Sequence, residues 1–343
     1  MRVLHLDSGR EWRGGQTQLL NLLRHRTHDA QVIVSIDAPA RDAIEALGAS
    51  TTAVNWSRPW VAAWQIRKAC QAWRPDAVAA HTSHAHTAAL LSGRPVVVHR
   101  RVDFVPSRIS TPKYRLARGY IAVSEAVKRV LVRAGVARQR VVVVHDGIEW
   151  PSPTGSRLLH RRTLGIPPDR RLAVCVGALV PHKDHRTAIK ALTCLAEPWH
   201  LYLVGEGAER ATLGALATAL GLGERVHFVG HSPRPLEWMQ AADVVVHPSR
   251  EEGLGQSILE ALALNCAVVG TEAGGIPEVL RGHGRVVPVS SPQALAAAWH
   301  QEALHPTVSD RQALAAAHCA AHMTRQTEAA YADLLAGGHP GPT

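Results

Sequence analysis

The sequence has few cysteines and few aromatic residues, and both shortages exclude classes of function. Its five cysteines are odd in number and never form a C-x-x-C pair, which indicates neither a disulfide framework nor a zinc site. Aromatic residues make up 4% of the chain, and zinc-finger spacing, heptad zippers and aromatic RNA-stacking motifs are absent. Nucleic acid is therefore not an expected partner.

Long apolar runs are also lacking. No run approaches the ~18 residues of a membrane-spanning helix, and the start, MRVLHLDSG, lacks the extended apolar region of a signal peptide. Together with the scattered cysteines, these absences make a reducing cytoplasm the expected location. Only the tail, residues 337–343, suggests disorder.

Positive charge is abundant, and it is concentrated in the first half of the chain. The 343 residues carry a net charge of +10; residues 1–150 hold 22 Lys+Arg against 11 Asp+Glu, whereas residues 151–343 hold 16 against 17. A basic face suits nucleic acid, an anionic membrane surface or an acidic acceptor. Without nucleic-acid motifs, the membrane surface and the acidic acceptor are favoured.

Short apolar runs alternate with helix-like segments throughout the chain. Strand-like runs occur at residues 2–6, 31–36, 77–80, 96–99, 120–123, 141–145, 172–176, 200–204, 226–230, 242–246 and 267–270. Such alternation predicts doubly wound, mainly parallel α/β domains. Residues 149–157, which contain two prolines and a glycine, read as a linker. The expected domains are therefore 1–150 and 151–320, followed by a helix and tail over 321–343.

A glycine-rich strand-to-helix turn follows the apolar run 242–246. Gly253 and Gly255 precede the helix expected at 256–264, and backbone N–H groups at such a turn suit a phosphate. Glu252 and Glu260 frame the turn and can face one crevice. A capping box, with Ser257 as the N-cap and Glu260 bonding back to it, accounts for the same residues about equally well.

A second glycine turn lies near the start of the chain. Gly14 and Gly15 precede the helix expected at 16–24, and Arg13 adds a positive charge beside them. The turn is a candidate anion site. A plain glycine turn is the alternative.

Two polar clusters follow strand ends in the first half. His81, His84 and His86 could ligate a metal, but polar loop histidines are the favoured interpretation because no carboxylate accompanies them. Arg100 and Arg101 could clamp a phosphate or carboxylate on an acceptor. Solvated arginines, or an ion pair with Asp103, are an equally good explanation.

Two further turns in the second half carry candidate residues. Lys183 follows the strand ending at Gly177 and is either a phosphate-binding charge or a surface lysine. The G-x-G turn Gly205-Glu206-Gly207 follows the strand at 200–204. A lone G-x-G is weak evidence for a nucleotide site, and its place and order in the chain strengthen it.

The run Glu252-Gly253-Leu254-Gly255 through Glu260 resembles the Glu-x7-Glu signature of retaining glycosyltransferases of family 4 (glycosyl transferases group 1). Other segments resemble landmarks of that family in the expected order: residues 13–20, 124–127, 145–148, 177–184, 205–207, 226–231 and 272–278. The chain is identified as a member of the family. The resemblance implies the GT-B arrangement, two facing Rossmann-like doubly wound domains with the active-site cleft between them, and a last helix that crosses back to the first domain.

The resemblance also implies roles for individual residues. Glu252, which contacts the transferred sugar, and Lys183, which neutralises the donor's phosphates, are the expected catalytic residues, and Glu260 hydrogen-bonds the ribose. The other expected donor-binding residues are Gly14, Gly15, Gly205, Glu206, His231, Gly253, Leu254 and Gly255. Weaker candidates for acceptor or phosphate binding are Arg13, Arg100, Arg101 and His81. The sequence departs from the family at Ala178, usually arginine, and at Arg101, usually histidine.

The implied activity is retaining transfer of a sugar from a nucleotide-diphosphate sugar, with a UDP-sugar as the first expectation. The expected acceptor is an anionic cell-surface glycan such as lipopolysaccharide core or a lipid-linked saccharide, reached at the cytoplasmic face of the inner membrane. No metal and no cofactor besides the donor are expected, since no D-x-D motif is evident. A nucleotide-sugar epimerase and a non-catalytic nucleotide-sugar-binding protein are the alternatives.

Overall fold

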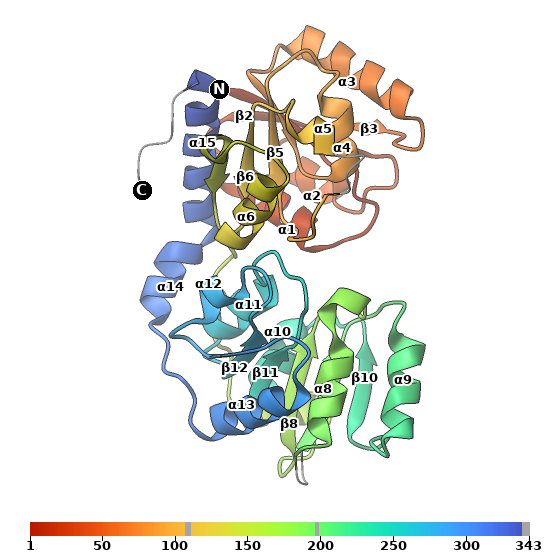
Figure 1. The fold of residues 1–343 in the computed structure, drawn as a ribbon, viewed down its shortest axis with the longest axis vertical. Coiled ribbons are helices and arrows are strands. Elements are labelled where there is room, and N and C mark those ends of the chain that lie inside the picture. The colour runs from red at the N-terminus through yellow and green to blue at the C-terminus, as the bar shows by residue number, and fades with distance from the viewer. Residues whose placement is uncertain (107–110, 196–198, 338–343) are drawn as a thin grey trace. The chain divides into compact units, whose positions relative to one another are not determined.

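The computed structural model describes residues 1–106, 111–195 and 199–337, which form two compact units (Figure 1). Unit 1 comprises Met1–Glu149 and Ala317–Thr343, and unit 2 comprises Trp150–Ala316. The tail expected to be disordered falls almost entirely on residues 338–343, outside the described residues.

Unit 1 contains a parallel sheet with helices packed on it. Its seven strands within the described residues follow the order β3-β2-β1-β4-β5-β6-β7, a doubly wound arrangement. The strands are β1 (Arg2–Leu6), β2 (Asp29–Ser35), β3 (Ser50–Val54), β4 (Ala77–Ala80), β5 (Val96–Arg100), β6 (Gly119–Ala122) and β7 (Val141–Val143). The helices are α1 (Gly14–His25), α2 (Arg41–Ala46), α3 (Pro59–Trp73), α4 (Ser83–Ala89), α5 (Thr111–Tyr114), α6 (Glu125–Arg133) and the 3₁₀ turn η1 (Arg138–Arg140).

Unit 2 repeats the same architecture with six strands among the described residues, in the order β10-β9-β8-β11-β12-β13. The strands are β8 (Arg171–Val176), β9 (Trp199–Val204), β10 (Val226–Gly230), β11 (Val244–His247), β12 (Val268–Thr271) and β13 (Arg285–Val287). The helices are α7 (Arg157–Thr163), η2 (Pro181–Lys183), α8 (His185–Leu192), α9 (Arg210–Ala219), α10 (Pro235–Ala241), α11 (Gln256–Ala263), α12 (Ile276–Leu280) and α13 (Pro292–Leu304), followed by α14 (Arg311–His318).

Burial explains why the central strands are almost purely apolar. Every residue of β4, β5 and β11 is buried, because helices cover both faces of a parallel sheet and leave no solvent-facing side. The polar exceptions in these three strands are His99 and Arg100, buried inside unit 1, and His247, buried inside unit 2. The predicted α/β architecture with mainly parallel sheets is confirmed.

The C-terminal helix α15 (Ala320–Ala336) is an integral part of unit 1. It packs against α1 and β6, and its apolar face joins the unit 1 core through Met323, Tyr331 and Leu334. None of the helices in the described part of the chain is both long and apolar enough to cross a membrane.

Candidate functional site

The loops that follow neighbouring strands of unit 2 bring the predicted donor residues to one edge of the sheet. β8 lies between β9 and β11, and all three strands are parallel. Their carboxyl ends therefore share an edge, which is where doubly wound sheets bind ligands. Lys183 lies in the segment after β8, and Glu252 lies in the segment after β11.

Lys183 and Glu252 form an ion pair at this edge. The Lys183 ammonium donates to Glu252 Oε2, and His247 Nε2 lies 2.8 Å from the same oxygen. Both side chains are largely buried, at 20% and 15% exposure. The backbone holds the two segments together, because Arg250 N donates to His182 O at 2.8 Å. The structure thus brings the two predicted catalytic residues into contact.

The surroundings of Glu252 keep it ionised. Burial opposes ionisation, yet the Lys183 ammonium and the His247 hydrogen bond outweigh it and hold the pKa of Glu252 well below its ordinary value. Burial, followed by the charge of Lys183, lowers the pKa of His247. A neutral His247 therefore donates from Nε2 to the carboxylate.

Helix α11 begins differently from the capping box considered above. Its N-cap is Gly255, with φ of 102°, a left-handed conformation that favours glycine. Ser257 lies inside the helix, where its hydroxyl is 3.2 Å from His247 Nδ1. The capping-box interpretation was wrong because glycine can make the tight turn that places the helix start one residue after Gly255.

Glu260 lies within α11 and accepts a hydrogen bond from Gln256 Nε2 at 3.0 Å. Burial raises its pKa, and the Gln256 bond opposes that shift only in part. Leu254, at 2% exposure, anchors the turn before the helix in the core, with Gly253 beside it. The turn is therefore buried, and it leads into a helix N-terminus that carries partial positive charge.

The G-x-G turn after β9 packs closely against the end of β8. A Cβ at Gly205 would lie 2.0 Å from the carbonyl oxygen of Gly177. Gly205 N donates to Gly230 O at 2.9 Å, and Leu179 N donates to Glu206 O at 2.8 Å. Glu206 follows β9 and His231 follows β10, so both lie at this edge of the sheet, and both are exposed.

Replacing Gly205 with alanine is expected to lower the free energy of unfolding by more than about 3 kcal/mol, because the new Cβ meets backbone and φ is +151°. Urea unfolding measures the change. Gly214→Ala in α9 is the matched control, since open space surrounds its Cβ position, and it is expected to stabilise by about 0.5–1 kcal/mol. Equal effects of the two substitutions would contradict the tight contact.

In unit 1, Gly14 and Gly15 are the first two residues of α1. Arg13 is the N-cap, and its backbone N–H donates to Gln16 Oε1 at 3.2 Å. The Arg13 guanidinium is exposed and pairs with Glu11 at 2.5 Å. The first turn of α1 contains no acidic residue, so no side chain of that turn offsets the partial positive charge at the helix N-terminus.

The two arginines after β5 have different surroundings. The Arg100 guanidinium is buried and donates to Val102 O at 3.1 Å, Tyr114 Oη at 3.1 Å and Phe104 O at 2.7 Å. Its nitrogens are therefore engaged in holding the segment that follows β5.

Arg101 pairs with Asp146 at 3.1 Å, whereas the sequence suggested Asp103 as an ion-pair partner. Its guanidinium also donates to His81 Nδ1 at 3.3 Å. Arg101 therefore links the segment after β7 to the segment after β4.

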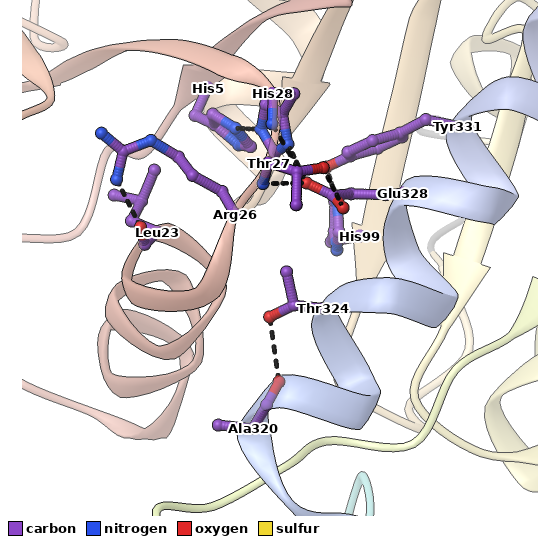
Figure 2. A network of polar contacts seen from close by, with 10 residues as sticks. All are labelled: His5, Leu23, Arg26, Thr27, His28, His99, Ala320, Thr324, Glu328 and Tyr331. Carbon is purple, nitrogen blue, oxygen red and sulfur yellow. Dashed lines mark hydrogen bonds and ion pairs between the residues drawn. The ribbon is translucent and has the colours of Figure 1, made fainter.

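His81, which is half-buried, belongs to a chain with the buried histidines His5 and His28 rather than to a cluster with His84 and His86. His81 Nε2 lies 3.0 Å from His5 Nδ1, and His5 Nε2 lies 3.1 Å from His28 Nε2. His28 Nδ1 lies 2.7 Å from the Glu328 carboxylate on α15, as Figure 2 shows. We call His81, His5 and His28 the histidine chain.

His84 and His86 lie on α4, the first exposed and the second buried against Tyr114. Within the described residues, no group of three His, Cys, Asp or Glu side chains could hold a metal ion. The metal interpretation of the H-x-x-H-x-H motif is therefore not supported by these positions.

The residues at the two ends of the histidine chain, Arg101 and Glu328, determine the direction in which its hydrogen bonds are donated. Arg101 can only donate, so His81 Nδ1 accepts and the His81 proton lies on Nε2. The proton of His5 must then lie on Nε2, and His28 donates from Nδ1 to the Glu328 carboxylate. Each ring is neutral in this arrangement, and burial lowers the pKa of all three histidines.

A fourth histidine, the buried His99, also contacts the histidine chain. Its ring stacks on His81 with centroids 4.3 Å apart, and its Nε2 lies 2.6 Å from the Tyr331 hydroxyl (Figure 2). Burial again lowers its pKa. Sequence reasoning missed His5, His28 and His99; for His5 and His99 the available signal was a histidine within the apolar strands RVLHL and VVVHR.

Comparisons with known proteins agree with this fold. The family model described as "Glycosyl transferases group 1" matches residues 156–311, and that described as "Glycosyltransferase Family 4" matches residues 14–149. The Anabaena protein Alr3699/HepE, solved in complex with UDP-glucose, superposes with a TM-score of 0.86 at 22% identity, covering 97% of this chain and 100% of that chain. Its fold is GT-B, which confirms the predicted fold class.

Two curated relatives match part of the chain. The D-inositol 3-phosphate glycosyltransferase of Mycolicibacterium gilvum is 34% identical over 150 residues, or 41% of this chain and 34% of the relative. The lipopolysaccharide core biosynthesis glycosyltransferase LpsE of Rhizobium meliloti is 34% identical over 143 residues, or 41% of this chain and 42% of the relative. Each match spans less than half of the relative's length. With two adjoining family models and a GT-B fold, the chain belongs to the family 4 glycosyltransferases (glycosyl transferases group 1).

Proposed function

We propose that the protein transfers a sugar from a nucleotide-diphosphate sugar, with a UDP-sugar as the preferred donor, and that the anomeric configuration is retained. The observation that carries this proposal is the buried Lys183–Glu252 pair beside the N-terminus of α11. The structural neighbour HepE was solved with UDP-glucose, which supports the choice of UDP.

Lys183 and the start of α11 are suited to stabilise a leaving diphosphate. As the bond to the sugar breaks, negative charge develops on the phosphate oxygens, and an ammonium and preorganised backbone N–H groups offset it. The diphosphate competes with Glu252 for the Lys183 ammonium. Glu252 then remains ionised through His247 and can accept hydrogen bonds from hydroxyls of the transferred sugar.

Glu260 is proposed to bind the ribose. Its carboxyl group is largely buried on α11, and only Gln256 offsets the burial that raises its pKa. The two neighbouring hydroxyl groups of a ribose can donate hydrogen bonds to an ionised Glu260 carboxylate. These hydrogen bonds would replace the solvation that burial removes.

The proposed acceptor is an anionic cell-surface glycan or a lipid-linked saccharide. The excess of positive charge in residues 1–150 favours an anionic acceptor, and LpsE acts in lipopolysaccharide core biosynthesis. A leaving phosphate oxygen would take the acceptor hydroxyl proton on the face from which the donor leaves. Transfer on that face retains the anomeric configuration, which NMR of the product would measure.

A panel of UDP-, GDP- and ADP-sugars tests the donor site by thermal shift. At ~100 times its Kd, the correct donor is expected to add about 2.7 kcal/mol of stability. Lys183→Ala and Glu260→Ala should both lose the shift, while Lys190→Ala, on the exposed side of α8, should keep it. If none of the nucleotide sugars raised the melting temperature, the result would contradict the proposal.

Turnover assays separate transfer from the other functions of this fold. Conversion of the donor is expected only when an acceptor is present, and it should persist in EDTA because Lys183 and α11 supply the positive charge. Conversion of the nucleotide sugar without an acceptor would indicate an epimerase instead. Donor binding without turnover over a broad acceptor panel would indicate a non-catalytic binding protein.

A further inference from the structure

Helix α3 turns large apolar side chains toward solvent. Ala62, Ile66 and Cys70 are buried toward the rest of unit 1, whereas Trp60 is 82% exposed and Trp64 is 61% exposed. Tryptophan is highly buried on average. Two tryptophans one helical turn apart on the outer face therefore form an unusual surface.

The apolar surface continues from α3 toward α4, which packs beside it (Figure 1). An open pocket of about 250 Å³ lies between them. Its lining includes Trp56, Trp60, Ala63, Ala88 and Leu91, and Leu91 is itself 47% exposed. We call Trp60, Val61, Trp64 and Leu91 the α3 patch.

Basic side chains flank the α3 patch. Arg58 precedes the helix, and Arg67 and Lys68 follow Trp64 by about one turn, all three exposed. The Lys68 ammonium lies 5.4 Å from the centroid of the Trp64 ring. Between Glu45 and Asp103 the only acidic residue is Asp76, and its carboxylate accepts a bond from Arg2 N at 2.8 Å.

The chemistry of the α3 patch decides among its possible occupants. A symmetric contact with a second copy would place Arg58, Arg67 and Lys68 near their own copies, and like charges repel. At the surface of an anionic bilayer, tryptophan rings lie at the level of the headgroups, and lysine and arginine side chains meet the lipid phosphates.

We propose that the α3 patch docks unit 1 onto an anionic lipid bilayer, with Trp60 and Trp64 inserted among the headgroups. The pocket beside Leu91 gives an acyl chain an apolar surface to contact. This docking goes beyond the proposed sugar transfer and does not depend on it, because it uses none of the residues assigned to the donor. It would hold the enzyme at the surface where lipid-linked acceptors lie.

Co-sedimentation of the full chain with vesicles tests the docking. The probes are vesicles of phosphatidylcholine alone and of phosphatidylcholine mixed with phosphatidylglycerol. Wild type is expected to sediment with the mixed vesicles, with a blue shift of tryptophan fluorescence, and binding should weaken as salt is added. Trp60→Ser/Trp64→Ser and Arg67→Glu/Lys68→Glu should each bind at least tenfold more weakly. Trp12→Ser, which changes another exposed tryptophan, should bind like wild type.

Circular dichroism and the donor thermal shift check that the variants remain folded, and these readouts also separate failed docking from a failed donor site. Wild type that stays in the supernatant with mixed vesicles would overturn the proposal. Equal vesicle binding by wild type and Trp60→Ser/Trp64→Ser would overturn it too. Self-association of wild type that Trp60→Ser/Trp64→Ser abolishes, without vesicle binding by either, would assign the α3 patch to a second copy instead.

Discussion

Replacing Lys183 with methionine is expected to lower kcat/KM for sugar transfer by about 10²–10³-fold. Methionine keeps much of the length of the side chain but removes the ammonium that pairs with Glu252 and, in the proposed reaction, with the departing diphosphate. Loss of one preorganised contact to developing charge corresponds to about 3–4 kcal/mol of transition-state stabilisation. Initial rates over a range of UDP-sugar concentrations measure the change.

A second substitution separates the catalytic role of Lys183 from its role in stability. Lys183→Met leaves the buried Glu252 carboxylate without its cation, which should lower the free energy of unfolding by about 3 kcal/mol. Adding Glu252→Gln removes the stranded charge and should restore most of that stability, but no activity. Lys190→Met on α8 is the matched control and should change neither quantity. Recovery of activity together with stability would show that Lys183 acts only as a structural partner.

The turn around Gly255 shows what local sequence can predict. Glycines after an apolar run correctly predicted a strand-to-helix turn, because strand and helix runs are local patterns. Local sequence did not identify the N-cap residue of α11. Ser257 and Gly255 both suit a helix start, and only the contact between Ser257 and His247 on the neighbouring strand distinguishes them.

Long-range pairs mark the limit of sequence reasoning in this protein. Lys183 and Glu252 could be proposed separately as site residues, but their contact joins segments 69 residues apart. The histidine chain is more extreme, since His28 meets Glu328 across 300 residues. No spacing in one sequence predicts such contacts, because they follow from strand order and from the return of α15 to unit 1.

Acidification is expected to destabilise unit 1 steeply. Burial, with neighbouring cations adding to it, holds the pKa of His5, His81 and His99 well below the ordinary value, and burial also lowers the pKa of His28 despite Glu328. In the unfolded chain these groups titrate near ~6.5. Their stabilisation is therefore complete above ~pH 6.5 and is lost as the pH falls from there toward the folded pKa values, because only the unfolded state binds the protons.

A histidine whose folded pKa lies well below its ordinary value costs about 1.4 kcal/mol at pH 5.5 relative to neutral pH, so His5, His81 and His99 together cost about 4 kcal/mol. That is a large share of the stability of an ordinary domain, about 5–15 kcal/mol. Urea unfolding at pH 7.5, 6.5 and 5.5, followed by circular dichroism, is expected to show the loss. A free energy of unfolding that stays constant over this range would contradict it.

His99→Phe tests the origin of this pH dependence. Phenylalanine can keep the stacking on His81 but binds no proton, so the slope of unfolding free energy against pH should fall by about 1.4 kcal/mol per pH unit below ~6.5. His300→Phe, at an exposed position on α13, should leave the slope unchanged. Equal slopes for wild type and His99→Phe would mean that the folded protein accommodates a charged His99.

The direction of the histidine chain gives this acid sensitivity its physical reason. His5 accepts at Nδ1 from His81 and donates from Nε2 to His28. A second proton on His5 would turn its Nδ1 into a donor that faces the N–H of His81. The hydrogen bonds between Arg101 and Glu328 could then no longer all be donated in the same direction. Protonating one ring therefore disturbs contacts that hold both β1 and α15 in unit 1.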